Sequence, residues 1–450
     1  MQPKVNKMGV MPINRLIINM SLPIIASMLV QALYNIVDSI FVAQINEQAL
    51  NAVSMAFPLQ NLMIAVATGT GVGLNALISK SLGEKDNKLA SKYAENGIFL
   101  AICSYILFLI IGLTCVRPFY EAQTDNAAII EYGVEYSTIV LVASIGVFVQ
   151  IAFERLMQST GKTVFHMATQ GTGAIINIIL DPILIFTFDM GVAGAAWATV
   201  IGQAVAGLMG LILNNKYNKE LKIDMKRFKP DFTAIKRIYI IGVPSIIMAS
   251  IGSIMYFGVN TILIKMNETA SAVFGVYFKL QSFIFMPVFG LNNGLIPIIG
   301  FNYGAQNRKR IMKTLKLGIL YAVGIMFIGL CVFQFLPTQL LLCFNASAEM
   351  LRIGVPALRI ISICFMFAGV CIVIGSLFQA FGKSLRSMFV SITRQLVILL
   401  PSAFLLSLTG EVNLVWFAFP IAEIGSCILS FIFFKNLYSK YIKKIPAGEE

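Results

Sequence analysis

Charge is scarce in this sequence, and that scarcity excludes an ordinary soluble domain. Only 12% of the 450 residues are charged, whereas soluble proteins carry about 25%. Hydrophobic residues make up 58% of the chain, and the mean hydropathy is +0.82. A soluble fold this apolar would expose large apolar patches, whereas a lipid bilayer covers them. The sequence therefore predicts an integral membrane protein with the lipid bilayer as a partner.

Motifs that carry chemistry are also lacking. The seven cysteines form no CxxC pair and indicate neither a disulfide framework nor a zinc site. Gly161-Lys162-Thr163 looks like the end of a phosphate-binding loop, but residue 156 is Leu where an earlier glycine is required. We find no pairing of a nucleophile with a base. These absences count against an enzyme, and we expect no cofactor except a coupling ion, H⁺ or Na⁺.

The sequence offers instead a series of long apolar runs. A membrane-spanning helix needs about 20 predominantly apolar residues, and twelve runs have this character. They fall at residues 15–43, 50–78, 94–116, 130–153, 165–188, 192–213, 237–264, 270–299, 314–336, 350–376, 387–408 and 412–434. The first run is long enough to span and lacks a clear A-x-A end, so we expect an uncleaved first helix.

Basic residues mark one side of the predicted membrane protein. Most of the 34 Lys and Arg fall in the N-terminus, in every second loop and in the C-terminus. The opposite side holds only Arg117, Lys265, Arg352 and Arg359. By the positive-inside rule both termini are expected to be cytoplasmic, which agrees with an even number of spans. Because the net charge of +13 sits in short loops, we expect no nucleic-acid partner.

The sequence matches itself without a gap when it is shifted by 221 residues. Matched pairs include Pro23 with Pro244, Asn46-Glu47 with Asn267-Glu268, Gly73-Leu74 with Gly294-Leu295, and Gly161-Lys162 with Gly382-Lys383. Each copy has six spans, so both copies enter from the same side, and parallel repeats of this kind are typical of transporters. We expect an N-lobe at 1–213, a basic cytoplasmic linker at 214–236 and a C-lobe at 237–450.

Polar side chains interrupt the apolar helices of the first half. An ionisable residue at bilayer depth is costly, so its default interpretation is functional. In two of the runs the polar residues repeat at helical spacing, and each series lies on one helix face. The series are Ser27, Gln31, Tyr34, Asn35 and Asp38 in the first run, and His166, Gln170, Asn177 and Asp181 in the fifth. Gln150 and Glu154 precede the second series, and Thr199 follows it.

The internal repeat tests whether the fold itself needs these residues. Under the shift of 221, the counterparts of Asp38, Asn177 and Asp181 are Val259, Ile398 and Ser402. Because the second half does without them, we predict a cation or proton site in the first half; a structural polar network is the alternative. A pair of carboxylates suits a proton, whereas added oxygens from Asn177 and Thr199 suit Na⁺. The residues leave this choice open.

The second half has charged residues of its own within predicted helices, namely Lys279, Arg394 and Glu423. They either pair with one another and lock the lobe together, or they shape substrate preference. We interpret the single histidine, His166, as structural or interfacial, with a proton relay as the alternative.

Four segments of the chain carry a resemblance to a known family. They are Ser21-Leu22-Pro23, Leu33-Tyr34-Asn35-Ile36-Val37-Asp38, Asn177-Ile178-Ile179-Leu180-Asp181-Pro182 and Gly194-Ala195-Ala196-Trp197-Ala198-Thr199. With them, the chain resembles over essentially its whole length the multidrug and toxic compound extrusion (MATE) transporters. The similarity is greatest to the bacterial branch with the DinF- and MepA-type proteins, and the third segment is its most specific part.

The resemblance implies an all-α membrane fold of twelve helices, in two six-helix bundles that form a V-shaped cavity. It also implies antiport of organic, cationic amphiphilic compounds against Na⁺ or H⁺. The implied cation site, which is also the only candidate metal site, is formed by Asp38, Asn177, Asp181 and Thr199. The implied substrate cavity has Gln31, Tyr34 and Glu154, to which we add Asn35, Gln150, Lys279 and Arg394. Lys279 and Arg394 are basic and depart from a site for purely cationic substrates.

The expected protein is therefore a secondary-active multidrug exporter, a monomer, in the bacterial cytoplasmic membrane. A lipid-linked precursor flippase of the same superfamily is the first alternative, and twelve spans with an acidic first half count against it. A membrane-embedded enzyme and a channel are further alternatives. The missing catalytic residues disfavour the enzyme, and the duplicated lobes with asymmetric carboxylates fit alternating access better than a channel.

Overall fold

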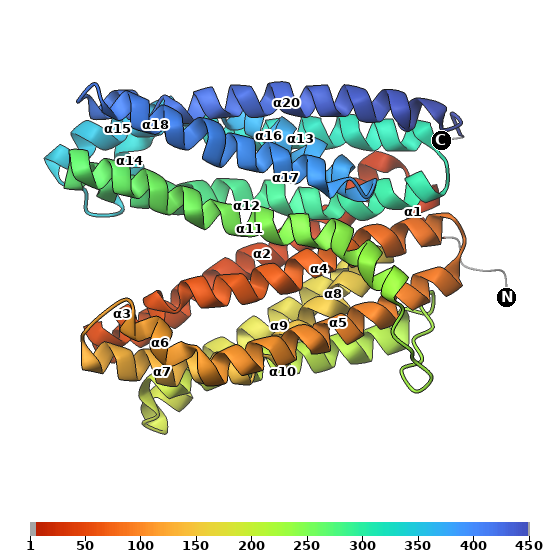
Figure 1. Ribbon diagram of the computed structural model, residues 1–450, viewed down its shortest axis with the longest axis horizontal. Coiled ribbons are helices and arrows are strands. Elements are labelled where there is room, and N and C mark those ends of the chain that lie inside the picture. Colours follow the sequence, from red (N-terminus) through yellow and green to blue (C-terminus); the bar gives the residue numbers. More distant parts are fainter. Residues whose placement is uncertain (1–5, 449–450) are drawn as a thin grey trace. The chain divides into compact units, whose positions relative to one another are not determined.

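The computed structural model of the chain describes residues 6–448, which are helical almost throughout (Figure 1). Within this range no strand occurs. Ten helical segments are long and apolar enough to cross a membrane, and two bent helix pairs bring the number to twelve. The all-α architecture with twelve spans that the sequence predicts is thereby confirmed.

The described residues pack into two compact units. The first contains Asn6 and Leu22–Ile246, and the second contains Lys7–Ser21 and the residues from Ile247 onward. Two long helices, α2 (Ile13–Ala43) and α11 (Phe232–Met266), pass from one unit to the other close to Pro23 and Pro244. Each unit therefore includes a segment from the opposite half of the sequence repeat.

The remaining helices of the first unit follow one another along the chain. They are α3 (Glu47–Met55), α4 (Phe57–Gly83), α5 (Asn87–Thr114), α6 (Val116–Glu121), α7 (Ala127–Val142), α8 (Ile145–Ser159), α9 (Thr163–Pro182), the π-helix η1 (Ile183–Thr187) and α10 (Gly191–Tyr217). Their apolar core lies between α4, α5, α7, α8 and α10. There the ring centroids of Phe108 and Phe148 are 5.7 Å apart.

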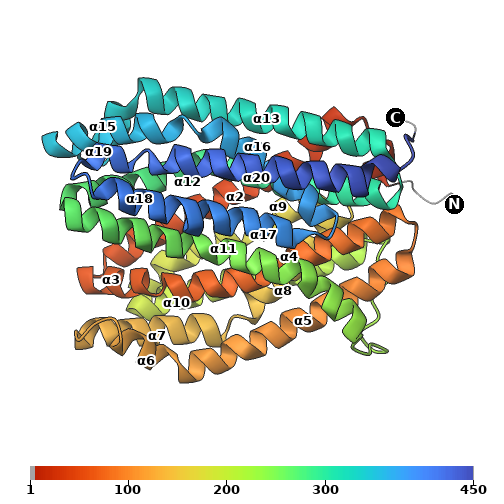
Figure 2. The ribbon, with the colours of Figure 1, turned by 45° about the horizontal axis from the view of Figure 1, so that its top comes forward.

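The second unit repeats this order. It holds α1 (Lys7–Val10), α12 (Glu268–Gly304), α13 (Arg308–Phe335), α14 (Pro337–Leu342), α15 (Ala348–Ser362), α16 (Phe365–Ala380), α17 (Ser384–Ile392), the π-helix η2 (Thr393–Leu399), α18 (Leu400–Ser407), α19 (Val412–Val415), α20 (Ala418–Lys440) and the 3₁₀-helix η3 (Ile442–Lys444). Helix α16 packs against both α13 and α20, and the three run alongside one another (Figure 2).

The helix boundaries are set by the same local chemistry in both units. An N-cap side chain accepts a hydrogen bond from a backbone N–H that has no partner inside the helix. Three such caps recur at the repeat offset, as Asn46 and Asn267, Asp86 and Asn307, and Asn126 and Ser347. The bends recur too, at 45° between α7 and α8 and at 46° between α15 and α16.

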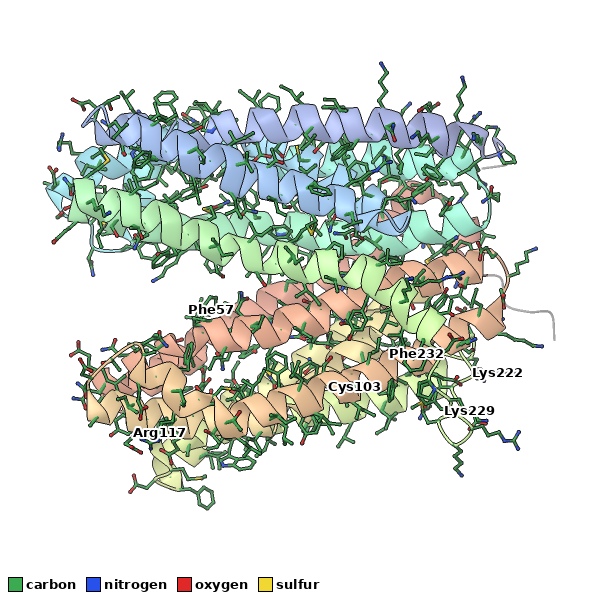
Figure 3. All side chains as sticks on the ribbon, viewed as in Figure 1. Phe57, Cys103, Arg117, Lys222, Lys229 and Phe232 are labelled. Atoms are coloured by element: carbon green, nitrogen blue, oxygen red, sulfur yellow. The ribbon has the colours of Figure 1, made fainter. Side chains whose placement is uncertain are left out.

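The basic linker lies against α5 in the first unit. The backbone N–H of Lys222 donates to Ser91 Oγ at 2.9 Å, and that of Asp231 donates to Asn96 Oδ1 at 3.0 Å. Lys222 and Lys229 point away from the helices at one end of this unit, and Arg117 lies at the other end (Figure 3). The two ends that the charge pattern assigns to opposite membrane faces are therefore opposite ends of the bundle.

Asp231 begins α11 as a charged cap. Its Oδ1 accepts hydrogen bonds from the backbone N–H groups of Thr233 at 2.7 Å and Ala234 at 3.1 Å, and its Oδ2 contacts the Lys92 ammonium. The hydrogen bond from Lys92, followed by the backbone bonds, lowers the pKa of Asp231 from 3.8 to about 2. The start of α11 is thus tied to α5 in the first unit.

Candidate functional site

The predicted cation-site residues lie on three helices of the first unit. Asp38 comes from the second half of α2, Asn177 and Asp181 from the last turns of α9, and Thr199 from α10. Asp181 is fully buried, Asn177 and Asp38 are buried, and Thr199 is half-buried. Pro182 follows Asp181 and cannot donate a backbone hydrogen bond. The helix continues there as the π-helix η1, an irregularity that is frequent at functional sites.

Two glycines bring α9 and α10 into backbone contact. A Cβ atom on Gly202 would lie 2.7 Å from the carbonyl oxygen of Gly173, which is closer than a side chain can come. The helices meet here without a side chain between them. One turn further along, Asn177 Nδ2 donates to Thr199 Oγ1 at 3.3 Å. The contact between the glycines therefore places polar atoms of two helices within reach of each other.

The structure joins Asn177 to the acidic residue of the same helix. Its Nδ2 also donates to Asp181 Oδ1 at 3.5 Å, a contact made possible by the four-residue spacing on one helix face. Asp38 interacts electrostatically with Asp181 from the neighbouring helix α2. All four predicted residues are therefore brought to one region of the first unit.

Three oxygen atoms in this region are buried without a hydrogen-bond donor. They are Asp38 Oδ1, Asn177 Oδ1 and Asp181 Oδ2. Buried polar atoms in folded proteins are normally satisfied, so each exception calls for an explanation. Carboxylate and amide oxygens are the ligands that hard cations prefer, and a carboxylate can take up a proton instead. Among the described side chains, no group of three His, Cys, Asp or Glu is arranged to hold a metal ion.

Two tyrosines close to the acidic pair extend the site. Tyr34 lies one turn before Asp38 on α2 and interacts electrostatically with both Asp38 and Asp181. Tyr136 on α7 is buried, interacts with Asp38, and accepts a hydrogen bond from Gln60 Nε2 at 3.1 Å. Sequence reasoning missed Tyr136 and Gln60. The only signal in the sequence was a tyrosine within an apolar run. Ordinary packing of an aromatic side chain explains such a tyrosine equally well.

A second polar cluster is centred on Glu154 of α8. Its Oε1 accepts hydrogen bonds from Gln150 Nε2 at 2.9 Å and from Thr169 Oγ1 at 3.2 Å. Gln150 Nε2 also donates to Gln170 Oε1 at 2.8 Å. Glu154 Oε2 lies 3.3 Å from His166 Nδ1, although the geometry is not that of a hydrogen bond.

His166 links this cluster to α2. Its Nε2 lies 3.2 Å from Ser27 Oγ, which also donates to the carbonyl oxygen of Ile24 at 2.8 Å. Gln31 on the same helix is half-buried, whereas Asn35 is exposed. On the polar face predicted for this helix, Ser27 and Asp38 are buried and Tyr34 is half-buried.

The basic residues predicted for the substrate cavity belong to the second unit. Arg394 Nη1 donates to Glu423 Oε2 at 3.2 Å, so two of the three charged residues pair with each other, as one of the two alternatives predicts. Lys279 is exposed on α12 and takes no part in that pair.

A family sequence profile with the description MatE matches this chain twice, at residues 23–183 and 244–405. The chain belongs to the MatE family. The two matches begin 221 residues apart, which is the offset of the internal repeat. The resemblance inferred from the four segments is thereby confirmed.

Two relatives of this MatE family member are named as multidrug export proteins. The multidrug export protein MepA of Staphylococcus haemolyticus (strain JCSC1435) is 25% identical over 422 residues, which cover 93% of both chains. MepA of Staphylococcus aureus (strain MRSA252) is 23% identical over 411 residues, which cover 90% of both chains. An outward-facing multidrug resistance MATE family transporter of the MOP superfamily has the same fold, with a TM-score of 0.92, 24% identity, and coverage of 99% of this chain and 100% of that one. Family and apolar helices together make this chain a multi-pass membrane protein.

Proposed function

We propose that this chain is a secondary-active multidrug exporter that moves organic, cationic amphiphilic compounds outward in exchange for H⁺ or Na⁺. The observation that carries the proposal is the set of unsatisfied buried oxygens on Asp38, Asn177 and Asp181. An uncompensated carboxylate at bilayer depth costs several kilocalories per mole, about 2.5–3.5 kcal/mol by insertion measurements. A cation or proton that binds there removes this cost, so the site is suited to switch between two occupancies.

Binding at this site would act on α2 and α9. Asp38 lies on α2, which contains Pro23 and passes between the units, and Asp181 lies directly before Pro182 and the π-helix η1. Both helices have places where the regular hydrogen-bond ladder is interrupted. Occupancy of the site would bias their conformation and thereby favour release of substrate. One charge moving through the membrane potential supplies about 2.3 kcal/mol per 100 mV.

The identity of the coupling ion depends on which oxygens take part. A proton needs only one carboxylate, either Asp38 or Asp181. Na⁺ would be held by several oxygens at once, and Asn177 Oδ1 and Thr199 Oγ1 are the neutral ligands at hand. A Thr199→Val substitution distinguishes coupling to Na⁺ from coupling to H⁺. It removes a Na⁺ ligand and leaves both carboxylates, either of which can take up a proton.

We further propose a bacterial cytoplasmic membrane location, cytoplasmic termini and a monomeric state. Bacterial relatives over more than nine-tenths of the chain support the location. The basic linker with Lys222 and Lys229 at one end of the first unit, opposite Arg117, supports the orientation (Figure 3). The substrate, a small organic molecule, and the surrounding lipid are the only partners that the function requires.

One observation favours a second candidate, a flippase for lipid-linked precursors. Lys279 is an exposed cation in the membrane-spanning helix α12. A cation in this position would suit an anionic lipid headgroup better than a cationic drug.

The test is efflux of a fluorescent cationic dye from liposomes that contain the purified protein, with a Na⁺ gradient and a pH gradient imposed separately. We expect one gradient to drive efflux, and we expect Asp38→Asn and Asp181→Asn to abolish the gradient-driven part. Asp125→Asn, in an exposed loop of the same unit, is the matched control and should retain full efflux. Efflux that survives in both site variants would contradict coupling at this site. No dye efflux under either gradient would turn attention to lipid substrates.

A further inference from the structure

The linker at residues 214–236 carries a surplus of positive charge. It has seven Lys or Arg and three acidic residues. Two of these acids face lysines outside the linker, because Glu220 Oε1 lies 3.7 Å from Lys162 Nζ and Asp231 Oδ2 contacts the Lys92 ammonium. They therefore do little to neutralise the basic residues of the linker itself.

The backbone of the linker is fixed along one face of α5. The ring centroids of Phe228 and Phe99 are 5.5 Å apart. Three backbone N–H groups of the linker donate to side-chain oxygens of α5, namely Lys222 to Ser91 at 2.9 Å, Asp224 to Glu95 at 2.9 Å and Asp231 to Asn96 at 3.0 Å. Helical spacing places the contacted α5 residues side by side. The linker is thus a built surface and more than a tether.

The internal repeat shows that this face of α5 is particular to the first half. At the offset of 221, the three acceptors on α5 correspond to residues that offer no side-chain oxygen. They are Met312 for Ser91, Lys316 for Glu95 and Leu317 for Asn96. A six-helix unit therefore packs without these acceptors, and in the first unit they serve to hold the linker.

Basic side chains extend outward from the fixed backbone. Lys222, Lys226, Arg227 and Lys229 are all exposed. Lys222 and Lys229 point away from the helices at the end of the first unit, and Phe232 lies nearby (Figure 3). The positive charges are thus held close together at one end of the bundle.

Apolar side chains are exposed among these charges. Phe232, the first residue of α11, is 82% exposed, and Met225 is 41% exposed. Helix α10 ends at Tyr217 and α11 begins at Phe232, and both are long and apolar enough to span a membrane. The linker therefore lies where two spans meet the membrane surface. Basic residues mixed with exposed aromatic and apolar ones are typical of segments that bind an anionic membrane surface.

We propose that the linker is a docking surface for anionic phospholipids. Lys226, Arg227 and Lys229 bind the phosphate, and Phe232 and Met225 contact the acyl-chain boundary. The positive-inside rule accounts for the sign of the charge but requires neither a fixed backbone nor an exposed aromatic ring. A nucleic acid also carries phosphates, but at the ends of two spans the bilayer itself brings lipid headgroups within reach. The inference goes beyond the proposed export function and does not depend on it.

Native mass spectrometry of the purified full-length protein in a nonionic detergent measures the binding of single lipids. The probes are phosphatidylglycerol, which is anionic, and phosphatidylcholine, which has no net charge. The test variant is Lys226→Gln/Lys229→Gln. The control is Lys85→Gln/Lys88→Gln, which removes two exposed lysines of the same unit that stand beside Glu84 and Asp86.

Each basic residue near an anionic membrane surface contributes about a fivefold factor in affinity. We therefore expect the test variant to bind phosphatidylglycerol about tenfold to thirtyfold more weakly than the wild type. The control should bind it as the wild type does, because acidic neighbours already neutralise its lysines. Phosphatidylcholine should bind all three proteins equally. An equal loss of phosphatidylglycerol binding in test variant and control would overturn the proposal, since any surface charge would then serve.

Phe99→Ala tests whether the fixed backbone matters. It removes the ring contact with Phe228 and keeps every charge of the linker. We expect a loss of phosphatidylglycerol affinity of about twofold to fivefold, because the basic side chains are then held less closely together. Unchanged affinity would overturn the built surface.

Two competitors identify the source of the phosphate. Inorganic phosphate and a short DNA oligonucleotide are added separately to the protein with phosphatidylglycerol bound. We expect neither to displace the lipid at an equal concentration, because neither has acyl chains to contact Phe232 and Met225. Displacement by inorganic phosphate would overturn the proposal in favour of a free anion, and displacement by DNA would overturn it in favour of a nucleic acid. Since no ion gradient is imposed, a failure of the proposed export function would leave these results unaffected.

Discussion

At the scale of single residues, the two copies of the repeat separate what the fold needs from what one half adds. The copies keep their helix caps, such as Asn46 and Asn267, because every helix start leaves backbone N–H groups without partners. They differ where buried charge occurs. Glu154 and His166 correspond to Gly375 and Ser387, which meet through a hydrogen bond from Ser387 Oγ to the Gly375 carbonyl oxygen. In the second unit an uncharged contact thus takes the place of the charged one.

Asp231 gives a prediction of pH dependence at this scale. Its folded-state pKa of about 2 lies below the ordinary 3.8, so its contribution to stability is present above pH 4 and is lost as the pH falls toward 2. We expect wild type to have a higher Tm than Asp231→Asn at pH 7, with the difference closing between pH 4 and pH 2. The measurement is thermal unfolding over this pH range.

A double-mutant cycle identifies the source of that difference. Lys92→Met should remove the same advantage, and adding it to Asp231→Asn should change little more. A difference in Tm that persists below pH 2 would show that the Asp231 charge is not its origin.

At the scale of elements, the geometry of the candidate cation site depends on how closely α9 and α10 approach. Asn177 and Thr199 face each other because Gly173 and Gly202 meet at the backbone one turn away. Directly after Asp181, Pro182 ends the α-helix and the chain continues as the π-helix η1. Local packing of small residues and an interrupted hydrogen-bond ladder together position the polar atoms.

Gly202→Ala tests this arrangement. A Cβ at 2.7 Å from a backbone oxygen forces the helices apart, which costs about 1–3 kcal/mol of stability by overpacking. We expect a lower Tm and a loss of ion-driven efflux, because the 3.3 Å contact between Asn177 and Thr199 lengthens. Gly171→Ala on the same helix as Gly173 is the matched control, since its Cβ meets nothing within 4 Å. Equal effects of the two substitutions would argue against the close approach.

At the scale of the whole molecule, the sequence predicted the twelve spans, because a spanning helix is defined by apolar length and the bilayer imposes that length on every span. It also predicted the repeat and the family. The bends between α7 and α8 and between α15 and α16 were not predictable, since hydropathy measures how apolar a segment is and does not indicate where its helix bends. The link between Ser27, His166 and Glu154 was missed because it joins three helices, and spacing within one helix cannot reveal such contacts.

Orientation in the membrane gives the prediction at this scale. Single cysteines replace Arg117 and Lys229 in a background without the exposed Cys115 and Cys343. With a membrane-impermeant maleimide on intact cells, we expect labelling at position 117 and protection at position 229. Inside-out vesicles should reverse the pattern, and labelling of both positions in intact cells would contradict cytoplasmic termini.

The passage of α2 and α11 between the units bears on how such a chain arose. Each unit is completed by a first helical segment that the sequence repeat assigns to the other copy. An ancestor with a single six-helix copy would have lacked that segment unless two chains exchanged it. A modern chain severed within the linker would yield two fragments that are each incomplete alone and that become whole only through reciprocal exchange.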